Sequence, residues 1–186
     1  MDIDLMILFN GFIKNYANLG LSIDSKSIDI INKENKYFIT LGKLLGFSVI
    51  SKKNDDGSIE IYWKECESNT ICTLLTKVNI TREVDLTKDL SVIYELINKV
   101  NMNNDNRYVL ILLVSSMKRI EFLNSVVKNS LRRGKYEILI IYIVRDVVEN
   151  IFNFYAYLFK NGEIIKNKVG ISSSDNDENL KAILKN

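Results

Sequence analysis

Two unbroken apolar runs constrain the fold of this chain more than any other feature. Tyr108–Val114 and Ile138–Val144 are each seven residues long. That length suits a strand buried on both faces and falls far short of the roughly 20 residues of a membrane span. Between them, Met117–Arg133 has a basic end followed by Gly134, which predicts a helix and its stop. Two buried strands joined by a helix predict a βαβ unit with a right-handed crossover.

Two amphipathic helices are expected near the N-terminus. Asp2–Ala17 carries apolar residues at helical spacing and is followed by Gly20. A second helix is expected over Ile28–Leu45, with Gly46 in the position after the last turn, where a left-handed backbone is favourable. The first helix is more apolar than one small domain needs, and this favours a homodimer.

The hydrophobic period then changes from 3.6 to 2, which predicts a three-stranded meander. The expected strands are Phe47–Lys53, Ile59–Glu65 and Ile71–Val78. Asn54–Gly57 is rich in residues that tolerate positive φ and predicts a hairpin turn, and Cys66–Asn69 predicts a second turn. In the middle strand, Ile59, Ile61 and Trp63 share one face, and Glu60, Tyr62 and Lys64 share the other.

A third helix, capped by Asp85 or Thr87, is expected to run to about Val100. The C-terminal elements are less regular. We expect a short helix over Arg145–Asn153, a hairpin formed by Tyr155–Phe159 and Glu163–Lys168, and a mobile tail from Gly170 with a short helix near Glu178–Leu184.

These elements predict an α/β fold in which helices flank a mixed central sheet. The 186 residues are expected to form one domain. Residues 1–27 would be an N-terminal helical extension, 28–144 the core, and 145–186 a helix, hairpin and tail. The acidic N-terminus lacks the basic residues of a signal peptide, so we expect a cytoplasmic protein without membrane contact.

Composition excludes several kinds of chemistry. Histidine is absent, which excludes Ser-His-Asp and Cys-His catalysis and His-ligated metals. The 25 basic and 23 acidic residues leave a net charge of +2, so bulk charge does not demand nucleic acid, although local patches still allow it. Cys66 and Cys72 are too few for a structural zinc site without histidine. Two reduced thiols are expected, with one disulfide as the alternative.

One stretch carries a family resemblance. In "KLLGFSVISKKNDDGSIEIYWKE" a helix ends at Gly, a strand follows, and an acid sits on a return strand that ends in Trp; "ICTLLTKV" is the next strand. Together with the order of elements, this region, from Lys33 to Val144, resembles the PD-(D/E)xK (restriction-endonuclease-like) nuclease superfamily. The resemblance implies an αβββαβαβ core with an extra N-terminal helix and a C-terminal hairpin. It also implies a phosphodiester-cleaving site at which carboxylates hold Mg²⁺.

Residue by residue, the resemblance places Glu60 at the first acidic position and Lys77 at the lysine position, where it would orient the attacking water. Glu34 matches an additional acid that some members supply. Glu60, Lys77 and Glu34 are therefore the catalytic candidates, and Glu60 and Glu34 are the candidate Mg²⁺ ligands. Leu75 stands where the second acid is expected. Because leucine cannot bind Mg²⁺, this departure favours a non-catalytic member of the fold.

Each candidate also has a purely structural interpretation. Glu60 is an ordinary acid for the polar face of a half-exposed strand, and Lys77 suits a strand edge that must resist aggregation. Glu34 suits a solvated helix surface, and Trp63 suits a core. A second acidic group, Glu83, Asp85 and Asp89 with Arg82 and Lys88, is explained by helix capping.

Basic residues bracket the Met117–Arg133 helix. Lys118 and Arg119 stand at its start, and Arg132, Arg133 and Lys135 at its end. They are the candidate nucleic-acid contacts, and the second group is alternatively explained by favourable charge at a helix C-terminus. Ser115 and Ser116 follow a buried strand, where open α/β sheets bind ligands, but no Gly-rich phosphate loop accompanies them.

Three functions follow from these observations. The first is a protein that binds or processes DNA or RNA on a nuclease-like fold, with a degenerate metal site; where the site is active, it would be a Mg²⁺-dependent nuclease. The second is a non-catalytic interaction or assembly protein on the same scaffold. The third is a nucleotide or small-molecule sensor that binds near Ser115.

Overall fold

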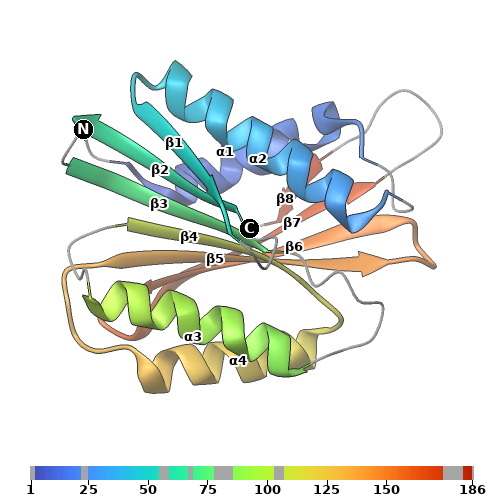
Figure 1. The fold of residues 1–186 in the computed structure, drawn as a ribbon. Coiled ribbons are helices and arrows are strands. Elements are labelled where there is room, and N and C mark those ends of the chain that lie inside the picture. The colour runs from blue at the N-terminus through green and yellow to red at the C-terminus, as the bar shows by residue number, and fades with distance from the viewer. Residues whose placement is uncertain are drawn as a thin grey trace.

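The computed structural model describes residues 3–21, 25–54, 59–66, 69–77, 86–102, 107–173 and 182–185, and it describes the side chains of these except at 27, 76, 77, 86–89, 173 and 182–185. Within these ranges one mixed sheet lies between two pairs of helices, α1 with α2 and α3 with α4 (Figure 1). The helices are α1 (Leu5–Tyr16), α2 (Ser27–Leu44), α3 (Leu86–Met102) and α4 (Met117–Ser130), with a short 3-10 turn η1 (Ala17–Leu19) after α1. The predicted α/β class, with helices on both sides of a mixed sheet, is therefore confirmed.

The strands of the described residues follow one another across the sheet in chain order. They are β1 (Ser48–Lys53), β2 (Ile59–Cys66), β3 (Asn69–Lys77), β4 (Arg107–Val114), β5 (Glu137–Asp146), β6 (Ile151–Lys160), β7 (Glu163–Ser173) and β8 (Ala182–Lys185). β1, β2 and β3 pair antiparallel, as the predicted meander requires. β3, β4 and β5 are parallel, so the βαβ unit is confirmed. β5 to β8 pair antiparallel.

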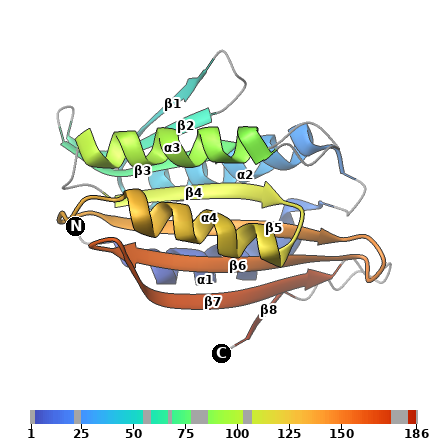
Figure 2. The same cartoon turned by 90° about the horizontal axis from the view of Figure 1, so that it is seen from below.

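Residues of the central strands point alternately into two separate cores. In β4, Val109 and Ile111 pack toward α1 and α2, whereas Leu110 and Leu112 pack toward α3 and α4. Figure 2, which views the molecule from the α3–α4 side, shows α4 lying over β4 and β5, with α3 beside it on the β3 side. Burial on both faces is the reason that these strands read as unbroken apolar runs.

Local sequence signals explain where α1 begins and where α2 ends. The side chain of Asp4 caps α1 by accepting hydrogen bonds from the backbone N–H groups of Met6 and Ile7. At the end of α2, Gly46 has φ +85°. Its N–H donates to the carbonyl of Lys43, while the N–H of Phe47 donates to that of Gly42. This pair of bonds is the Schellman arrangement, which requires a left-handed residue at Gly46.

The apolar face of α1 is covered within the chain. Its buried residues are Leu5, Met6, Leu8, Phe9, Phe12, Ile13 and Tyr16. Phe12 and Tyr16 make edge-on ring contacts with Phe154 of β6. The segment expected to be an extension thus contributes to the core, and most apolar side chains of α1 are buried, whereas Ile7 stays exposed. The homodimer stays a prediction.

Two C-terminal predictions are wrong. The expected helix at Arg145–Asn153 is instead the end of β5, a turn and the start of β6. Asn150 takes φ +54° in this turn, and the Asp146 side chain accepts hydrogen bonds from the N–H groups of Val148 and Glu149. The described end of the expected 178–184 helix belongs to strand β8, which pairs with β7.

Other predictions are confirmed or fall outside the described residues. The hairpin around Asn161 and Gly162 is confirmed, with longer strands than expected. The cores of the turns at 54–57 and 66–69 and the cap of α3 lie outside the described ranges, as does most of the C-terminal tail. Within those ranges, no helix is both long and apolar enough to cross a membrane.

Candidate functional site

Glu60 lies on β2, directly opposite Leu75 of β3. Leu75 packs into the α3–α4 core, and alternation along β2 puts Glu60 on this same side, away from Ile61 and Trp63. The family resemblance implies a second carboxylate at position 75. The strand register instead places the buried side chain of Leu75 next to Glu60.

The carboxylate of Glu60 is buried and fully engaged. The residue is 4% exposed. Its Oε1 lies 2.5 Å from Nζ of Lys99 on α3 and accepts a hydrogen bond of 2.7 Å from Nδ2 of Asn54. Its Oε2 accepts a hydrogen bond from the hydroxyl of Tyr62. The expectation that Glu60 stands on a half-exposed polar face is therefore wrong.

These partners set the charge of the group. Burial acts to raise the pKa of Glu60, but hydrogen bonds from Lys99, Tyr62 and Asn54 outweigh burial, and its pKa lies below the usual value. Burial, reinforced by the nearby Glu60 carboxylate, raises the pKa of Tyr62. The cluster is thus a carboxylate–ammonium pair with a neutral phenol donor. It is a satisfied buried polar network, which fixes β2 against α3.

Glu34 occupies a different place in the fold. It lies on α2, is 1% exposed, and its Oε1 accepts a hydrogen bond of 3.2 Å from the hydroxyl of Tyr16 on α1. Burial raises its pKa to about 8, against the lowering effects of the Tyr16 hydrogen bond and of the Arg145 charge. Glu34 is therefore mostly protonated at neutral pH, and its interpretation as a solvated surface charge is wrong.

The sheet separates the two candidate ligands. Glu34 belongs to the α1–α2 side, and Glu60 faces α3 on the other side. Lys77 is the last residue of β3, where its backbone pairs with Leu112, and its side chain lies outside the described set. Because β3 lies between β2 and β4, the interpretation of Lys77 as an edge-strand lysine is wrong.

The residues present do not fit the Mg²⁺ ion that the family resemblance implies. Both Glu60 oxygens have donors, the opposite residue is Leu75, and Glu34 is on the far side of the sheet. Across the described ranges, no group of three or more Cys, Asp or Glu residues is placed to hold a metal ion. A cation that gives up its water reluctantly needs more than one free carboxylate.

Sequence reasoning missed Lys99. The one readable signal was its spacing from Glu95, four residues earlier on the same helix, and these two side chains do pair at 3.2 Å. Which strand α3 faces depends on the crossover between β3 and β4, so the contact with Glu60 could not be read from spacing alone.

The second candidate site is the basic segment after α4. Arg132, Arg133 and Lys135 are exposed, and no ion pair to them occurs in the part of the chain that the structure describes. Their backbone is nevertheless held in place. The N–H of Arg132 donates to Oδ1 of Asn101 at 3.2 Å, and its carbonyl accepts a hydrogen bond from the hydroxyl of Tyr136.

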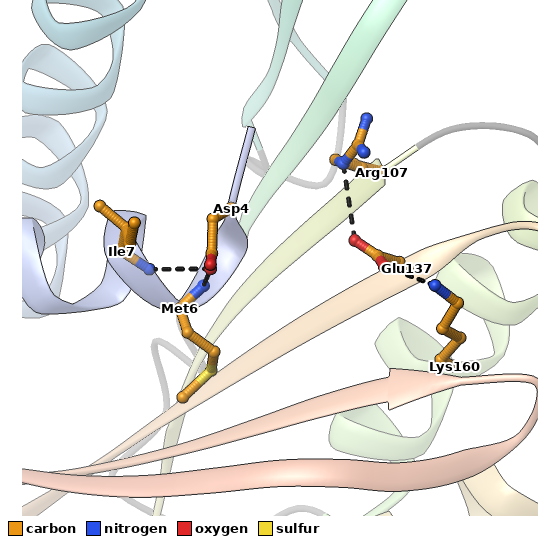
Figure 3. Close-up of polar contacts among 6 residues, drawn as sticks. All are labelled: Asp4, Met6, Ile7, Arg107, Glu137 and Lys160. Atoms are coloured by element: carbon orange, nitrogen blue, oxygen red, sulfur yellow. Dashed lines mark hydrogen bonds and ion pairs between the residues drawn. The ribbon is translucent and has the colours of Figure 1, made fainter. Parts of the chain in front are cut away.

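Neighbouring cations at this end of the molecule are paired. Glu137 binds Arg107 and Lys160, with N–O distances of 3.6 and 3.0 Å (Figure 3). Lys128, on the last turn of α4, pairs with Glu163 at 3.1 Å. Glu137 and Glu163 are thus engaged with other cations, and among the described residues no carboxylate pairs with Arg132, Arg133 or Lys135. We call these three residues the basic segment.

The other basic pair lies at the opposite end of α4. Ser116 caps this helix by accepting from the N–H of Arg119, and Lys118 is exposed beside it. Because α4 has 14 residues, the two groups are about 20 Å apart along the axis. The structure therefore does not bring Lys118 and Arg119 together with the basic segment.

The remaining candidate residues from the sequence are the two cysteines, Trp63, the second acidic group and the two serines after β4. Cys66 is exposed, Cys72 is buried, and both are free thiols, as expected. Trp63 is fully buried and stacks on Phe47, so it belongs to the core. In the acidic group, 82–85 and the side chains of 88 and 89 lie outside what is described. Ser116 acts as a helix cap, and Ser115 is exposed next to it.

Comparisons with known proteins assign neither a family nor a function to this chain. A scan against protein-family models gives no match to this chain. A search of curated proteins gives no match either. The geometry of the two candidate sites is therefore what bears on function.

Proposed function

We propose that this protein binds nucleic acid through the basic segment and does not cleave it. The observation that carries the proposal is the contrast at the end of α4. Arg132, Arg133 and Lys135 are exposed and have no carboxylate partner among the residues that the structure describes, while Arg107, Lys128 and Lys160 pair with Glu137 or Glu163. Exposed cations on a fixed backbone are suited to phosphate groups, which release counterions when they are bound.

The arrangement around Glu60 supports binding without cleavage. Its carboxylate is committed to Lys99 and Asn54, and Leu75 stands opposite. Membership of the PD-(D/E)xK superfamily is part of the proposal, with this protein as a degenerate member whose metal ligands have been replaced by a structural ion pair.

Binding is tested by fluorescence anisotropy with labelled single- and double-stranded DNA and RNA over a range of salt concentrations. We expect the affinity to fall steeply with salt. The double variant Arg132→Ala/Arg133→Ala should bind more weakly, and its slope of log affinity against log salt should be smaller by about 1 to 2, because each phosphate contact contributes roughly 0.9 on B-DNA.

A matched control removes two positive charges elsewhere. Lys14→Ala/Lys43→Ala lies on the α1–α2 side and should leave affinity and slope close to those of the unaltered protein. Equal losses in both double variants would mean that only net charge matters, and the basic segment would lose its role. Absence of binding by every nucleic acid at low salt would overturn the function itself.

Cleavage is tested on the same nucleic acids with Mg²⁺ or Mn²⁺, beside Glu60→Ala. We expect no metal-dependent cleavage by either protein. Cleavage that requires the metal and disappears in Glu60→Ala would show a live nuclease, and the non-catalytic part of the proposal would then be wrong.

A further inference from the structure

An open groove runs between α1 and α2 on the outer surface of the molecule. It consists of two adjoining hollows of about 510 and 400 Å³ that share Asn15, Tyr37 and Leu41. On the α1 side its lining extends from Ile3 to Leu19, a path of about 24 Å at helical rise. The groove is on the face of the sheet opposite to α4, so it is separate from the basic segment.

The groove combines an apolar floor with apolar shoulders. Tyr37, Leu41 and Phe47 line the floor. On the shoulders, Ile7 is 67% exposed and Leu44 is 79% exposed. The opposite faces of both helices already fill the α1–α2 core, so these outward side chains contribute nothing to it. Large apolar side chains gathered at one groove are typical of a docking surface.

The exposed charges along the two helices are mostly positive. Lys33 and Lys36 line the groove, and Lys14 and Lys43 are exposed elsewhere on the same helices. Residues 5–16 contain no acid, and Glu34 of α2 is buried.

Among the described residues of this pair of helices, the exposed acids lie where each helix begins, and one of them, Asp4, lines the end of the groove. Asp4 is occupied by its capping bonds to Met6 and Ile7 (Figure 3), and Asp29 lies in the first turn of α2. The occupant best matched by this rim carries negative charge.

We propose that the α1–α2 groove binds an acidic amphipathic helix of a partner protein. A helix of about four turns matches the 24 Å path, its apolar residues at positions i, i+3, i+4 and i+7 would meet the floor, and its flanking carboxylates would face the lysines. A second copy of this chain would bring another lysine-rimmed face and be repelled. A flat bilayer would touch the shoulders without reaching the floor.

Gly11 keeps the groove open at its middle. A Cβ at this position would lie 3.7 Å from the hydroxyl of Tyr37, an ordinary contact. A larger side chain would therefore be accepted by the fold while it narrows the groove. Gly11→Leu is the obstructing variant, and Gly11→Ala is its mild counterpart.

The test uses blocked synthetic peptides of about 16 residues, the length of four to five helical turns. The first has leucines at i, i+3, i+4 and i+7 with glutamates between them. A second has lysines in place of the glutamates, and a third has the composition of the first in scrambled order. Binding to the full chain is followed by fluorescence anisotropy, and the contact site by backbone amide NMR shifts.

We expect the acidic amphipathic peptide to bind, with amide shifts centred on Gly11, Tyr37 and Leu41. Gly11→Leu and Lys36→Glu/Lys43→Glu should each weaken it at least about tenfold, which corresponds to roughly 1.4 kcal/mol. The charge-reversed variant should gain affinity for the lysine peptide. Arg132→Ala/Arg133→Ala should have no effect, so this outcome is independent of nucleic-acid binding.

Three results would overturn the proposal. One is equal binding of the scrambled peptide, which would reduce the effect to net charge. Another is failure of the acidic peptide to bind while phosphatidylglycerol vesicles bind and shift the same amides, which would make the surface a membrane contact. The third is no binding by peptide or vesicle when circular dichroism shows every variant folded.

Discussion

Gly42 of α2 lies against the indole ring of Trp63 on β2, so closely that a Cβ at Gly42 would come 2.5 Å from Nε1 of the ring. Trp63 is fully buried and stacked on Phe47, with ring centroids 5.7 Å apart. The missing side chain of Gly42 therefore lets α2 approach the sheet at the point where the largest side chain of the core is placed.

Gly42→Ala should consequently destabilise the protein, although alanine is the better helix former. Overpacking of a filled core costs about 1–3 kcal/mol, which exceeds the gain of about 0.5–1 kcal/mol from replacing glycine in a helix. Gly11→Ala is the matched control, because its Cβ meets only ordinary contacts, and it should be stabilising. Urea unfolding of both variants checks the opposite signs, and a stable Gly42→Ala would show that α2 is not held against Trp63.

Glu34 should make stability fall as pH rises. Burial raises its pKa from 4.5 to about 8, so the folded state binds this proton more tightly than the unfolded state. By linkage, its favourable contribution is full below about pH 4.5, declines with rising pH, and is lost once pH passes about 8. Glu34→Gln cannot titrate, so the difference in unfolding free energy between the two proteins should change across this window. A constant difference would contradict the burial of the carboxyl.

Lys99→Met should destabilise the protein most at neutral pH. It leaves the carboxylate of Glu60 buried without its cation, and a charged hydrogen bond of this kind is worth about 1.5–3 kcal/mol. The pKa of Glu60 is lowered in the folded state, so its contribution is present above its unfolded pKa and is lost as pH falls through the folded pKa. The penalty of the variant should therefore shrink in acid. Glu60→Gln/Lys99→Met is the control, because it removes both charges and should lose less than the single variant does.

The two thiols should differ sharply in reactivity. Cys66 is exposed, whereas Cys72 is fully buried on β3 and burial raises its pKa to about 12. A thiol reagent at pH 8 should modify Cys66 at once and Cys72 only when the protein unfolds. Mass spectrometry of the labelled protein, with Cys66→Ser as the control, separates the two. Rapid labelling of both sites would show that β3 is not covered by α1 and α2.

Local signals predicted most of the fold. Gly46 marks the end of α2 through its positive φ, and the unbroken apolar runs of β4 and β5 reveal strands buried on both faces. The helix expected after β5 is wrong, because Val147 and Val148 are exposed in a turn and form no buried face. The alternation that begins at Phe152 carried the correct signal for a strand.

The candidate site was less accessible from sequence, for a physical reason. Pairing of neighbouring strands follows from a short hairpin, so Glu60 and Leu75 could be set side by side. Lys99, the partner of Glu60, comes from α3. Glu34 meets Tyr16, its partner on α1, only when α1 and α2 pack together. Such contacts depend on how helices lie on the sheet, which spacing along the chain does not encode.

The position of α1 has a consequence for how the chain reaches this structure during synthesis. Because the strands are ordered as they are made, each new strand emerges beside a partner that is already present. α1 is the exception: it is made first, but Tyr16 packs on Phe154 of β6, and Ile13 lies against Gly170 of β7. Phe12 can meet Phe38 of α2 early, but the part of the α1 face that packs on β6 and β7 must wait for almost the whole chain to leave the ribosome. Closing this long loop is the slow kind of contact in folding, and until it closes the nascent protein exposes the surface that a chaperone would bind.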